Sequence, residues 1–376
     1  MEKRKMDKLG IETSLLGFGC MRFPKNEDGS INEELSEQML DLAMASGVNY
    51  YDTAYPYHDG ESEKFLGKVL DKYDRDSYIL TTKLPLFDIS TLKEAEEIFE
   101  VQMERLHKDY VDFYLLHAMD GKKFQTVKEL GLLDFMERLK KEGRIRHIGF
   151  SFHDKYEAFE EILTGYDWDV CQIQYNYMDT KENPGDRGYE LAEKMGIPVI
   201  VMEPVRGGLL AEFSEDIEGK FRAVQPELST ASWALRWVAS HPGVKVILSG
   251  MSSMEQVQDN LNTFTNYKPM TEQELATVDD VVATLHARVQ NDCTGCRYCM
   301  PCPAGVNIPR NFRLWNMYHM YRKYRVVRGP WEHTKETEFP KNCIECGRCE
   351  KYCPQKIHIR EDLKKVQRDL DGKIFP

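Results

Sequence analysis

Eight of the ten cysteines in this 376-residue sequence are crowded near its C-terminal end. They form two runs, Cys293-x2-Cys296-x2-Cys299-x2-Cys302-Pro303 and Cys343-x2-Cys346-x2-Cys349-x3-Cys353-Pro354. A step of three residues lets one tight loop present three thiolates to three corners of an iron–sulfur cubane, while the fourth ligand comes from the other run. The spacing therefore predicts two iron–sulfur clusters.

Structural zinc is the alternative chemistry for this cysteine set. A zinc site needs four tetrahedral ligands, which usually come from two C-x-x-C pairs. Two evenly spaced triplets, each with its own cysteine-proline, fit zinc poorly. Ligand spacing sets neither the potential of a cluster nor its access to other redox groups, so it leaves open whether the clusters carry electrons or are purely structural.

The two cysteine runs resemble the bacterial two-cluster ferredoxin family. The resemblance implies two [4Fe–4S] clusters, one held by Cys293, Cys296, Cys299 and Cys353, the other by Cys343, Cys346, Cys349 and Cys302. The first run departs from the family in having two residues, Met300 and Pro301, before its last cysteine, where the family usually has three. The 40 residues between Cys302 and Cys343 also form a longer insertion than the smallest ferredoxins have.

Composition and charge bound the class of protein. Hydrophobic residues make up 41% and charged residues 30% of the chain, as in a soluble globular protein. No apolar run approaches the roughly 20 residues of a membrane span, and the charged first ten residues have no apolar segment behind them. We therefore expect a cytoplasmic protein without a membrane span. In that reducing compartment, cluster ligation is more common than a disulfide scaffold.

The net charge of −12 is unevenly distributed along the chain. Residues 286–376 hold 18 Lys and Arg against 10 Asp and Glu, a net charge of +8, so the remainder carries −20. The overall negative charge argues against non-specific nucleic-acid binding, and we expect no nucleic-acid partner. A basic region of this kind could contact RNA, but packing on the acidic body or facing an acidic protein partner fits it at least as well.

Four polar residues stand at or just after the ends of apolar runs in the first half of the chain. Asp52, Lys83 and His117 each close such a run, and Tyr57 follows Asp52 in the next loop. An ammonium at the end of an apolar strand needs a partner carboxylate. If the runs are strands of a parallel barrel, all four side chains project into one mouth.

The elements that would position these residues alternate between short apolar runs and longer segments of helical period. Candidate strands are 15–21, 48–54, 77–84, 111–118, 146–152, 169–176, 198–204 and 244–251. Candidate helices are 33–45, 92–106, 127–141, 229–240 and 272–289, the last behind a capping box, and the first half of 311–331. Eight strands alternating with helices predict an α/β fold, a (β/α)₈ TIM barrel over 1–285, followed by a small, mainly helical cluster domain over 286–376.

A doubly wound dinucleotide-binding sheet is the competing architecture. It would normally show a glycine fingerprint after its first strand. Gly17-Phe18-Gly19-Cys20 is followed neither by the third glycine nor by a helix start.

In the C-terminal region, the aromatic residues of 311–331 are interpreted as a packing surface rather than a base-stacking platform.

Five segments occur in an order that resembles the aldo-keto reductase family. They are Leu16-Gly17-Phe18-Gly19, Asp52-Thr53-Ala54-Tyr55-Pro56-Tyr57, Thr82-Lys83, Leu115-Leu116-His117 and Ile148-Gly149-Phe150-Ser151. The resemblance implies an NAD(P)H-dependent carbonyl reductase on a (β/α)₈ barrel, with Asp52, Tyr57, Lys83 and His117 as the catalytic tetrad. The whole chain resembles the group of these reductases that bears a C-terminal two-cluster ferredoxin domain.

The chemistry of the four residues agrees with those roles. Reduction of a carbonyl adds a hydride to carbon and a proton to the developing alkoxide, so an acid is needed. An unperturbed tyrosine has a pKa near 10, and a close Lys83 cation is expected to lower the pKa of Tyr57 by favouring tyrosinate. Asp52 would hold Lys83 charged and oriented. His117 could fix the carbonyl oxygen through a hydrogen bond.

The family pattern also implies contacts to the nicotinamide cofactor. Ser151 and Gln172 would hold the carboxamide, with Phe152 in place of the asparagine usually beside that serine, and Met202 replaces the stacking tyrosine. The further contacts that the resemblance implies are Gly208, Gly250, Gln256 and Asn260. Gly250 and Gln256 stand where NADP-preferring members carry Lys and Arg, so a 2′-phosphate lacks charge-assisted partners, and NADH is favoured.

Joining the two regions leaves three functional hypotheses. In the first, NAD(P)H feeds a reductase whose clusters exchange electrons with a ferredoxin-like carrier. In the second, the protein serves electron transfer or docking and the barrel is only a scaffold. The intact tetrad argues against this second hypothesis, because a scaffold does not need it. In the third, the enzyme's clusters are purely structural. The expected substrate is a small carbonyl or alcohol compound. A flavin is a further possible cofactor: no flavin-binding motif is evident, but barrel mouths can bind flavin phosphate without a short signature.

Overall fold

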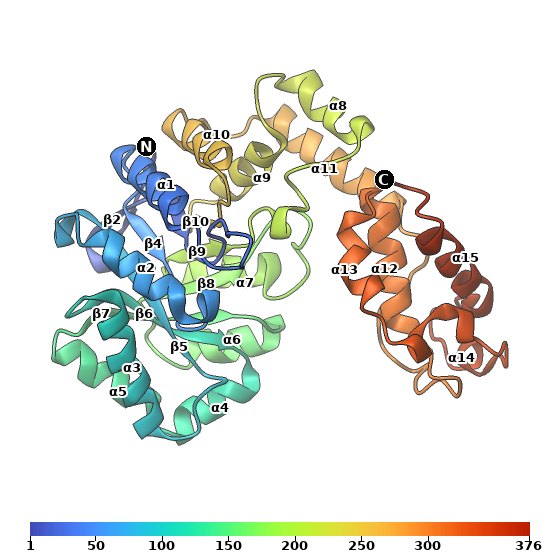
Figure 1. The fold of residues 1–376 in the computed structure, drawn as a ribbon, viewed down its shortest axis with the longest axis horizontal. Helices are drawn as coiled ribbons and strands as arrows, with labels where there is room; N and C mark the ends of the chain where they lie inside the picture. The colour runs from blue at the N-terminus through green and yellow to red at the C-terminus, as the bar shows by residue number, and fades with distance from the viewer. The chain divides into compact units, whose positions relative to one another are not determined.

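The computed structural model describes all 376 residues, and they fall into two compact units (Figure 1). The barrel unit comprises Met1–Gly207 and Ala231–Thr271; the cluster unit comprises Gly208–Thr230 and Glu272–Pro376. The packing thus divides the chain differently from the single boundary at residue 285 expected from the sequence. One excursion of the barrel chain, Gly208–Thr230, and the helix that follows the barrel both belong to the cluster unit.

Eight parallel strands close into a barrel in the order β10-β3-β4-β5-β6-β7-β8-β9. Their bounds are β3 Leu16–Gly19, β4 Tyr50–Asp52, β5 Ile79–Pro85, β6 Val111–Met119, β7 Ile145–Phe152, β8 Val170–Gln174, β9 Val199–Met202 and β10 Val244–Ser249. Each lies within or close to a run predicted from its apolar composition, because strands covered on both faces carry apolar side chains throughout. The predicted TIM barrel is confirmed.

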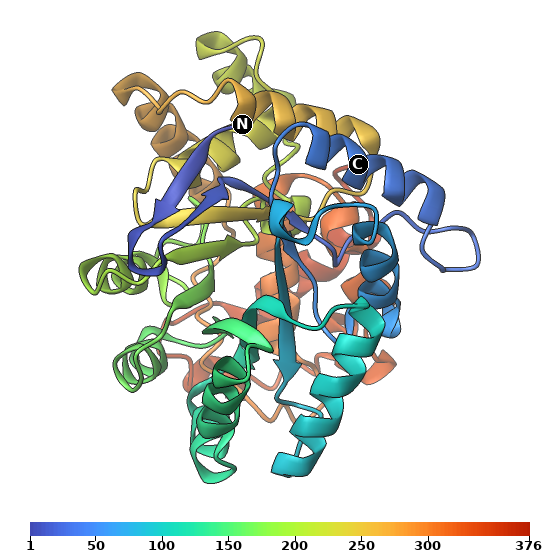
Figure 2. The same cartoon turned by 90° about the vertical axis from the view of Figure 1, so that its left-hand side faces the viewer.

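Helices surround the strands, as Figure 2 shows. They are α1 Glu33–Ala45, α2 Glu61–Leu70, α3 Leu92–Leu106, α4 Gly121–Glu129, α5 Leu132–Lys141, α6 Tyr156–Thr164, α7 Gly185–Lys194, α9 Thr230–Ala239 and α10 Met254–Thr265. The single helix predicted for 127–141 is wrong. It is two helices, because Gly131 adopts the left-handed conformation (φ 66°) and ends the periodicity there.

An N-terminal hairpin, β1 Lys3–Met6 and β2 Ile11–Ser14, was not expected from the sequence. Met6 is fully buried and packs in a small apolar cluster with inward-facing strand residues, among them Tyr50, Phe113 and Val246. The hairpin therefore closes one end of the barrel. The polar strand ends described below lie at the other.

The cluster unit has its own core. It contains α8 Glu215–Val224, α11 Glu272–Ala287, α12 Ile308–Tyr321, α13 Arg325–Glu332, α14 Arg348–Lys351 and α15 Ile359–Asp371. Phe312, Trp315 and Tyr318 of α12 are buried against Val366 and Leu370 of α15. These aromatic side chains are a packing surface, as the sequence predicted.

Ion pairs attach the excursion 208–230 to this unit. Glu212 binds Lys323 and Arg325, and Asp216 binds Arg288 with Arg322 nearby. Acidic residues of the excursion thus meet part of the basic charge that distinguishes the C-terminal region. No helix in the structure is long and apolar enough to cross a membrane.

Candidate active site and cluster ligands

Three of the four predicted catalytic side chains form one hydrogen-bonded group at the carboxyl ends of β4 and β5. The ammonium of Lys83 donates to Asp52 Oδ1 (2.6 Å), to the carbonyl of Thr53 (2.7 Å) and to Tyr57 Oη (3.3 Å). Lys83 is fully buried and Asp52 is 3% exposed. A buried ammonium is tolerated only when it is paired and its donors are satisfied. The group is therefore held together by its own electrostatics.

Asp52 is satisfied on both oxygens. Its Oδ2 accepts a hydrogen bond from Gln172 Nε2 at 3.0 Å. Gln172, expected from the sequence at the nicotinamide, thus also fixes the carboxylate that holds Lys83. The two roles are compatible, because an amide has a second polar atom free to face the cavity.

The pKa shifts in this group differ from the sequence expectation for Tyr57. Burial raises the pKa of the Tyr57 hydroxyl, and the nearby Lys83 offsets only part of this rise, since Asp52 opposes tyrosinate. The expected net lowering is therefore wrong. Burial also disfavours the charged form of Lys83, yet Asp52 and Tyr57 together outweigh burial and raise the pKa of Lys83. At neutral pH the tyrosine is protonated and the lysine charged.

A second buried network fixes the strand that carries Lys83. Glu63 of α2 accepts hydrogen bonds from Thr82 Oγ1 (2.6 Å) and Gln102 Nε2 (2.7 Å), and its other oxygen lies 3.2 Å from Arg105. Gln102 also donates to the backbone carbonyl of Lys83 (3.1 Å). All members are satisfied, so the network locks α2, α3 and β5 in one register behind the site.

Tyr57 stands on a tight turn with unusual backbone angles. His58, Asp59 and Gly60 follow it with φ values of 51°, 56° and 91°. Gly60 has the largest of these φ values, and glycine is favoured there because it adopts a left-handed conformation without steric cost. The strained turn aims the tyrosine at the barrel mouth, a pattern that recurs at functional sites.

His117, at the end of β6, completes the set. Its ring lies edge-on to the Tyr57 ring, 5.9 Å between centroids. Burial, reinforced by Lys83, lowers the pKa of His117 to about 3. The imidazole is therefore neutral across the working pH range and can donate one hydrogen bond from its protonated nitrogen.

The structure places the predicted cofactor contacts in different surroundings. Ser151 is buried and accepts a hydrogen bond from the Ala118 amide (2.8 Å), while Asn260 donates to Ser249 Oγ (2.9 Å). Gln256 accepts from the Ser252 amide (2.7 Å). Gln172, Met202 and Gly250 line one cavity together with Asp52, Tyr57 and His117. Gly208 belongs to the cluster unit.

This cavity, at the barrel mouth, has a volume of about 640 Å³ and contains a residue that the sequence reasoning missed. Arg22 lies across Gly250, with its Cγ only 2.6 Å from where a Cβ would stand. Its guanidinium makes no ion pair, and Lys25, also lining the cavity, makes none. Gly250 therefore makes room for the Arg22 side chain from a neighbouring loop. The cation lies at the segment where Gly250 stands in place of the basic residue of NADP-preferring family members. The signal available was the basic pattern Met21-Arg22-Phe23-Pro24-Lys25 directly after the first strand.

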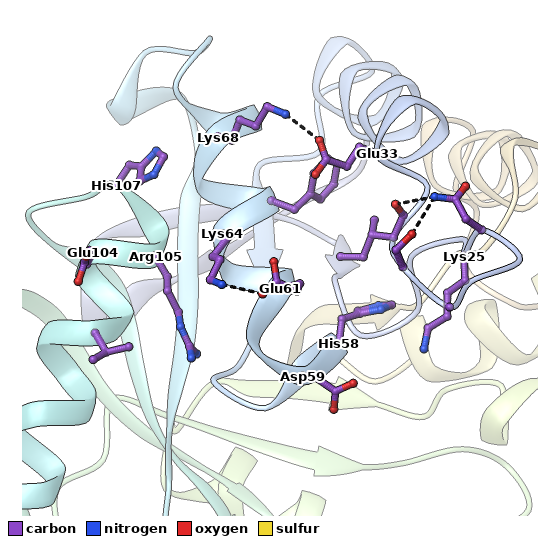
Figure 3. A pocket seen from close by; sticks show the side chains of 16 residues that line it. Lys25, Glu33, His58, Asp59, Glu61, Lys64, Lys68, Glu104, Arg105 and His107 are labelled. Carbon is purple, nitrogen blue, oxygen red and sulfur yellow. Dashed lines mark hydrogen bonds and ion pairs between the residues drawn. The ribbon is translucent and has the colours of Figure 1, made fainter.

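A larger cavity, about 850 Å³, shares Lys25 and His58 with the mouth (Figure 3). Its walls carry opposite charges that neutralise one another: Lys64 pairs with Glu61 (2.6 Å) and Lys68 with Glu33 (2.7 Å), as the dashed lines in Figure 3 show. It holds no group comparable to Asp52, Tyr57 and Lys83. The smaller cavity is therefore the candidate active site.

The eight clustered cysteines line two small hollows. Cys293, Cys296, Cys299 and Cys353 line the first, and Cys343, Cys346, Cys349 and Cys302 line the second, to which Cys299 also contributes. These are the two sets that the ferredoxin resemblance implied, including the exchange of the last cysteine between runs. No three Cys, His, Asp or Glu side chains in the structure are placed to hold a single metal ion. The cysteines thus surround spaces, as a cubane requires, rather than converge on a point.

Comparison with known proteins agrees with both units. The model of the aldo/keto reductase family matches residues 15–283, and that of a 4Fe-4S dicluster domain matches 292–358. An uncharacterized oxidoreductase of Bacillus subtilis, YqkF, is 26% identical over 73% of this chain and 94% of its own. The L-galactose dehydrogenase of Arabidopsis thaliana is 28% identical over 72% of this chain and 90% of its own.

Solved structures resemble the barrel closely. The holo form of an aldo-keto reductase from Bacillus halodurans, AKR11C1, superposes with a TM-score of 0.62 at 26% identity, covering 74% of this chain and 96% of that one. An aldo-keto reductase from Klebsiella pneumoniae, solved in complex with NADPH, has the same fold at 23% identity and a TM-score of 0.59, covering 73% of this chain and 92% of that one. The chain belongs to the aldo/keto reductase family and carries a C-terminal 4Fe-4S dicluster domain.

Proposed function

We propose that the protein reduces small carbonyl compounds, or oxidises the corresponding alcohols, with a nicotinamide nucleotide bound in the mouth cavity. The observation that carries the proposal is the fully buried Lys83, held between Asp52 and Tyr57. Burying an ammonium is costly, and a protein scaffold has no need of it. The reductase hypothesis is therefore favoured over a barrel that serves only for docking.

The residues present fit the cofactor. The cavity volume suits a small ligand or part of a dinucleotide, and Gln172, Met202 and Gly250 line it beside the proposed catalytic group. When bound, a reduced nicotinamide supplies the hydride. Arg22 and Lys25 both line the cavity, and we propose that Arg22, which lies across Gly250, meets a nucleotide phosphate. It weakens the argument for NADH drawn from Gly250 and Gln256, so the choice between NADH and NADPH depends on Arg22.

The chain's own residues perform the acid chemistry. The Tyr57 hydroxyl, kept protonated by its raised pKa, donates its proton to the carbonyl oxygen as that oxygen becomes an alkoxide. Lys83 stabilises the tyrosinate left behind. Neutral His117 donates a hydrogen bond to the same substrate oxygen and so orients it.

The cysteine sets fit two [4Fe–4S] clusters, and we propose that the clusters transfer electrons between the enzyme and a ferredoxin-like carrier. A nicotinamide gives two electrons as a hydride, whereas each cluster takes one at a time. The clusters are therefore matched to exchange with a one-electron carrier and not to hydride transfer itself. A purely structural role would leave turnover unchanged on cluster loss.

Tyr57→Phe tests the reductase. In the cluster-loaded protein, kcat for NAD(P)H-dependent reduction of a panel of aldehydes, ketones and sugars should fall by about 10²–10⁴-fold, the usual contribution of a general acid. Nucleotide affinity should not change, because only a hydroxyl is removed. Tyr55→Phe is the matched control in the same loop and should leave kcat as it is. Retention of more than a few per cent of kcat by Tyr57→Phe would exclude Tyr57 as the acid.

A further inference from the structure

Exposed aromatic side chains flank the first cysteine hollow. Tyr298 is 68% exposed and directly precedes Cys299; Tyr352 is 53% exposed and directly precedes Cys353. Both cysteines line that hollow, but neither tyrosine does. Large exposed aromatic residues mark interaction surfaces, because tyrosine contributes much contact area at little cost in conformational entropy.

Unpaired basic residues accompany the two tyrosines. Arg297, Lys351 and Lys356 are exposed and make no ion pair in the structure. The acidic residues of the same cysteine loops are largely neutralised: Glu350 binds Arg360 (2.8 Å) and Glu345 binds Lys364 (2.8 Å). Asp292 is the one exposed carboxylate of these loops without a partner. The surface is therefore basic and apolar together.

Charge balance within the cluster does not account for the two lysines. Four thiolates give a [4Fe–4S] site a negative charge, and a cation against the site would tune its potential. Arg297 lines the first hollow and can act in this way. Lys351 and Lys356 are exposed and line neither hollow, and the ammonium of Lys351 lies 6.0 Å from the centre of the Tyr352 ring. Exposed cations act on a partner in solution rather than on the cluster.

We propose that Arg297, Tyr298, Lys351, Tyr352 and Lys356 form the docking surface for an acidic one-electron carrier of the ferredoxin kind. This inference rests on the electron-transfer part of the proposed function and assigns the entry point to the cluster of Cys293, Cys296, Cys299 and Cys353. The balance is one electron: the reduced carrier loses it, the cluster gains it, and no bond or proton changes. The basic charge steers the acidic carrier, and the tyrosines give it a small apolar contact typical of transient redox complexes.

Stopped-flow reduction of the clusters tests the surface on the full, iron-loaded chain. With a reduced acidic ferredoxin at low ionic strength, the bimolecular rate constant should fall steeply as salt is added. Lys356→Glu should lower it by about tenfold, and Tyr352→Ser by several-fold. Lys373→Glu is the matched control, since Lys373 is also exposed and also has a left-handed backbone (φ 46° against 52° for Lys356). It should change the rate little.

Two further readouts separate docking from damage to the cluster. Reduction by the small reductant methyl viologen radical needs no docking and should be equal in all variants. The affinity of the oxidised ferredoxin, measured by calorimetry, should fall in Lys356→Glu in parallel with the rate. The proposed docking surface would be wrong if Lys356→Glu and Lys373→Glu lowered the rate constant of cluster reduction equally. It would also be wrong if that rate constant did not depend on salt concentration.

The remaining outcomes are distinct from failure of the reductase. Clusters that methyl viologen cannot reduce would overturn both this surface and the electron-transfer role, while the Tyr57 experiment would stand. A homodimer that Tyr352→Ser dissociates would assign the surface to a second copy of the chain. Loss of turnover in Tyr57→Phe has no bearing on the rate of cluster reduction.

Discussion

The barrel site and the cysteine loops are organised in opposite ways. In the barrel, Lys83, Asp52 and Gln172 are buried and satisfy one another through hydrogen bonds. In the cysteine loops, residues 291–302 form neither helix nor strand, and Cys296 and Cys346 are exposed. The polar groups of the barrel site thus hold one another in place. The cysteines line two small hollows in segments with little regular structure.

The difference shows where each site obtains its geometry. A catalytic group must be in place before substrate arrives, so the protein's own network holds it. A cluster ligand set can be assembled around its cofactor, since binding and folding share one free energy. Basic side chains without ion pairs occur both at the barrel mouth and in the cysteine loops. Arg22 and Lys25 are the examples at the mouth, and Lys351 and Lys356 are the examples in the loops.

Removal of iron should have the largest effect of the three changes. It should unfold the cysteine loops and leave the barrel folded. After anaerobic oxidation and chelation, peptides of 291–305 and 341–358 should lose protection from hydrogen exchange, because their fold depends on the bound clusters. Peptides of β5 and β6 should keep theirs. Equal loss of protection in barrel and cysteine loops would show that the two regions do not differ in this way.

Acid should destabilise the barrel site through His117. Its pKa of about 3 lies below the unfolded value of 6.5, so the unfolded chain binds more protons and stability falls as pH drops from about 6.5 towards 3. Between pH 7 and pH 5 this amounts to about 2 kcal/mol. Between pH 7 and pH 5, the free energy of unfolding of the His117→Gln barrel should fall by about 2 kcal/mol less than that of the wild type. Urea-dependent hydrogen exchange of the β6 amides measures the difference. His107→Gln, at an exposed histidine that contacts Asp71 on the barrel surface, is the comparison for a substitution that leaves the buried site intact.

The smallest effect is expected at the rim. Arg22→Gln should weaken NADPH binding by about tenfold, the usual contribution of a charged hydrogen bond, and leave NADH binding unchanged if Arg22 meets the 2′-phosphate. Fluorescence titration with both nucleotides measures this, with Lys25→Gln as the neighbouring cation for comparison. Equal weakening for both nucleotides would place Arg22 at a phosphate that they share. No change for either would remove Arg22 from the cofactor site.

Local signals in the sequence were sufficient for most of the barrel. All eight strands were found because each is a short apolar run, and α1 and α3 were found with their observed bounds because their periodicity is unbroken. The hairpin β1–β2 was missed since each strand has only four residues and β1 is mostly charged. The break at Gly131 was missed because apolar periodicity continues on both sides of it.

Local signals were weaker wherever distant segments meet. The excursion 208–230 follows a barrel strand in sequence but is tied to the cluster unit through Glu212 and Asp216. The net rise in the pKa of Tyr57 follows from the degree of burial, which sequence does not give. Arg22 became a candidate only through its contact with Gly250, 228 positions away along the chain.

The sequence by itself determined the chemistry available: the residue types at the strand ends, the cysteine spacing and the order of strands and helices. These follow from covalent order and local periodicity. The tertiary structure alone decided which groups share charge, which are desolvated and which face solvent. Those properties depend on distances between residues far apart in the chain, and electrostatic interactions and burial are set by distance and surroundings, not by sequence position.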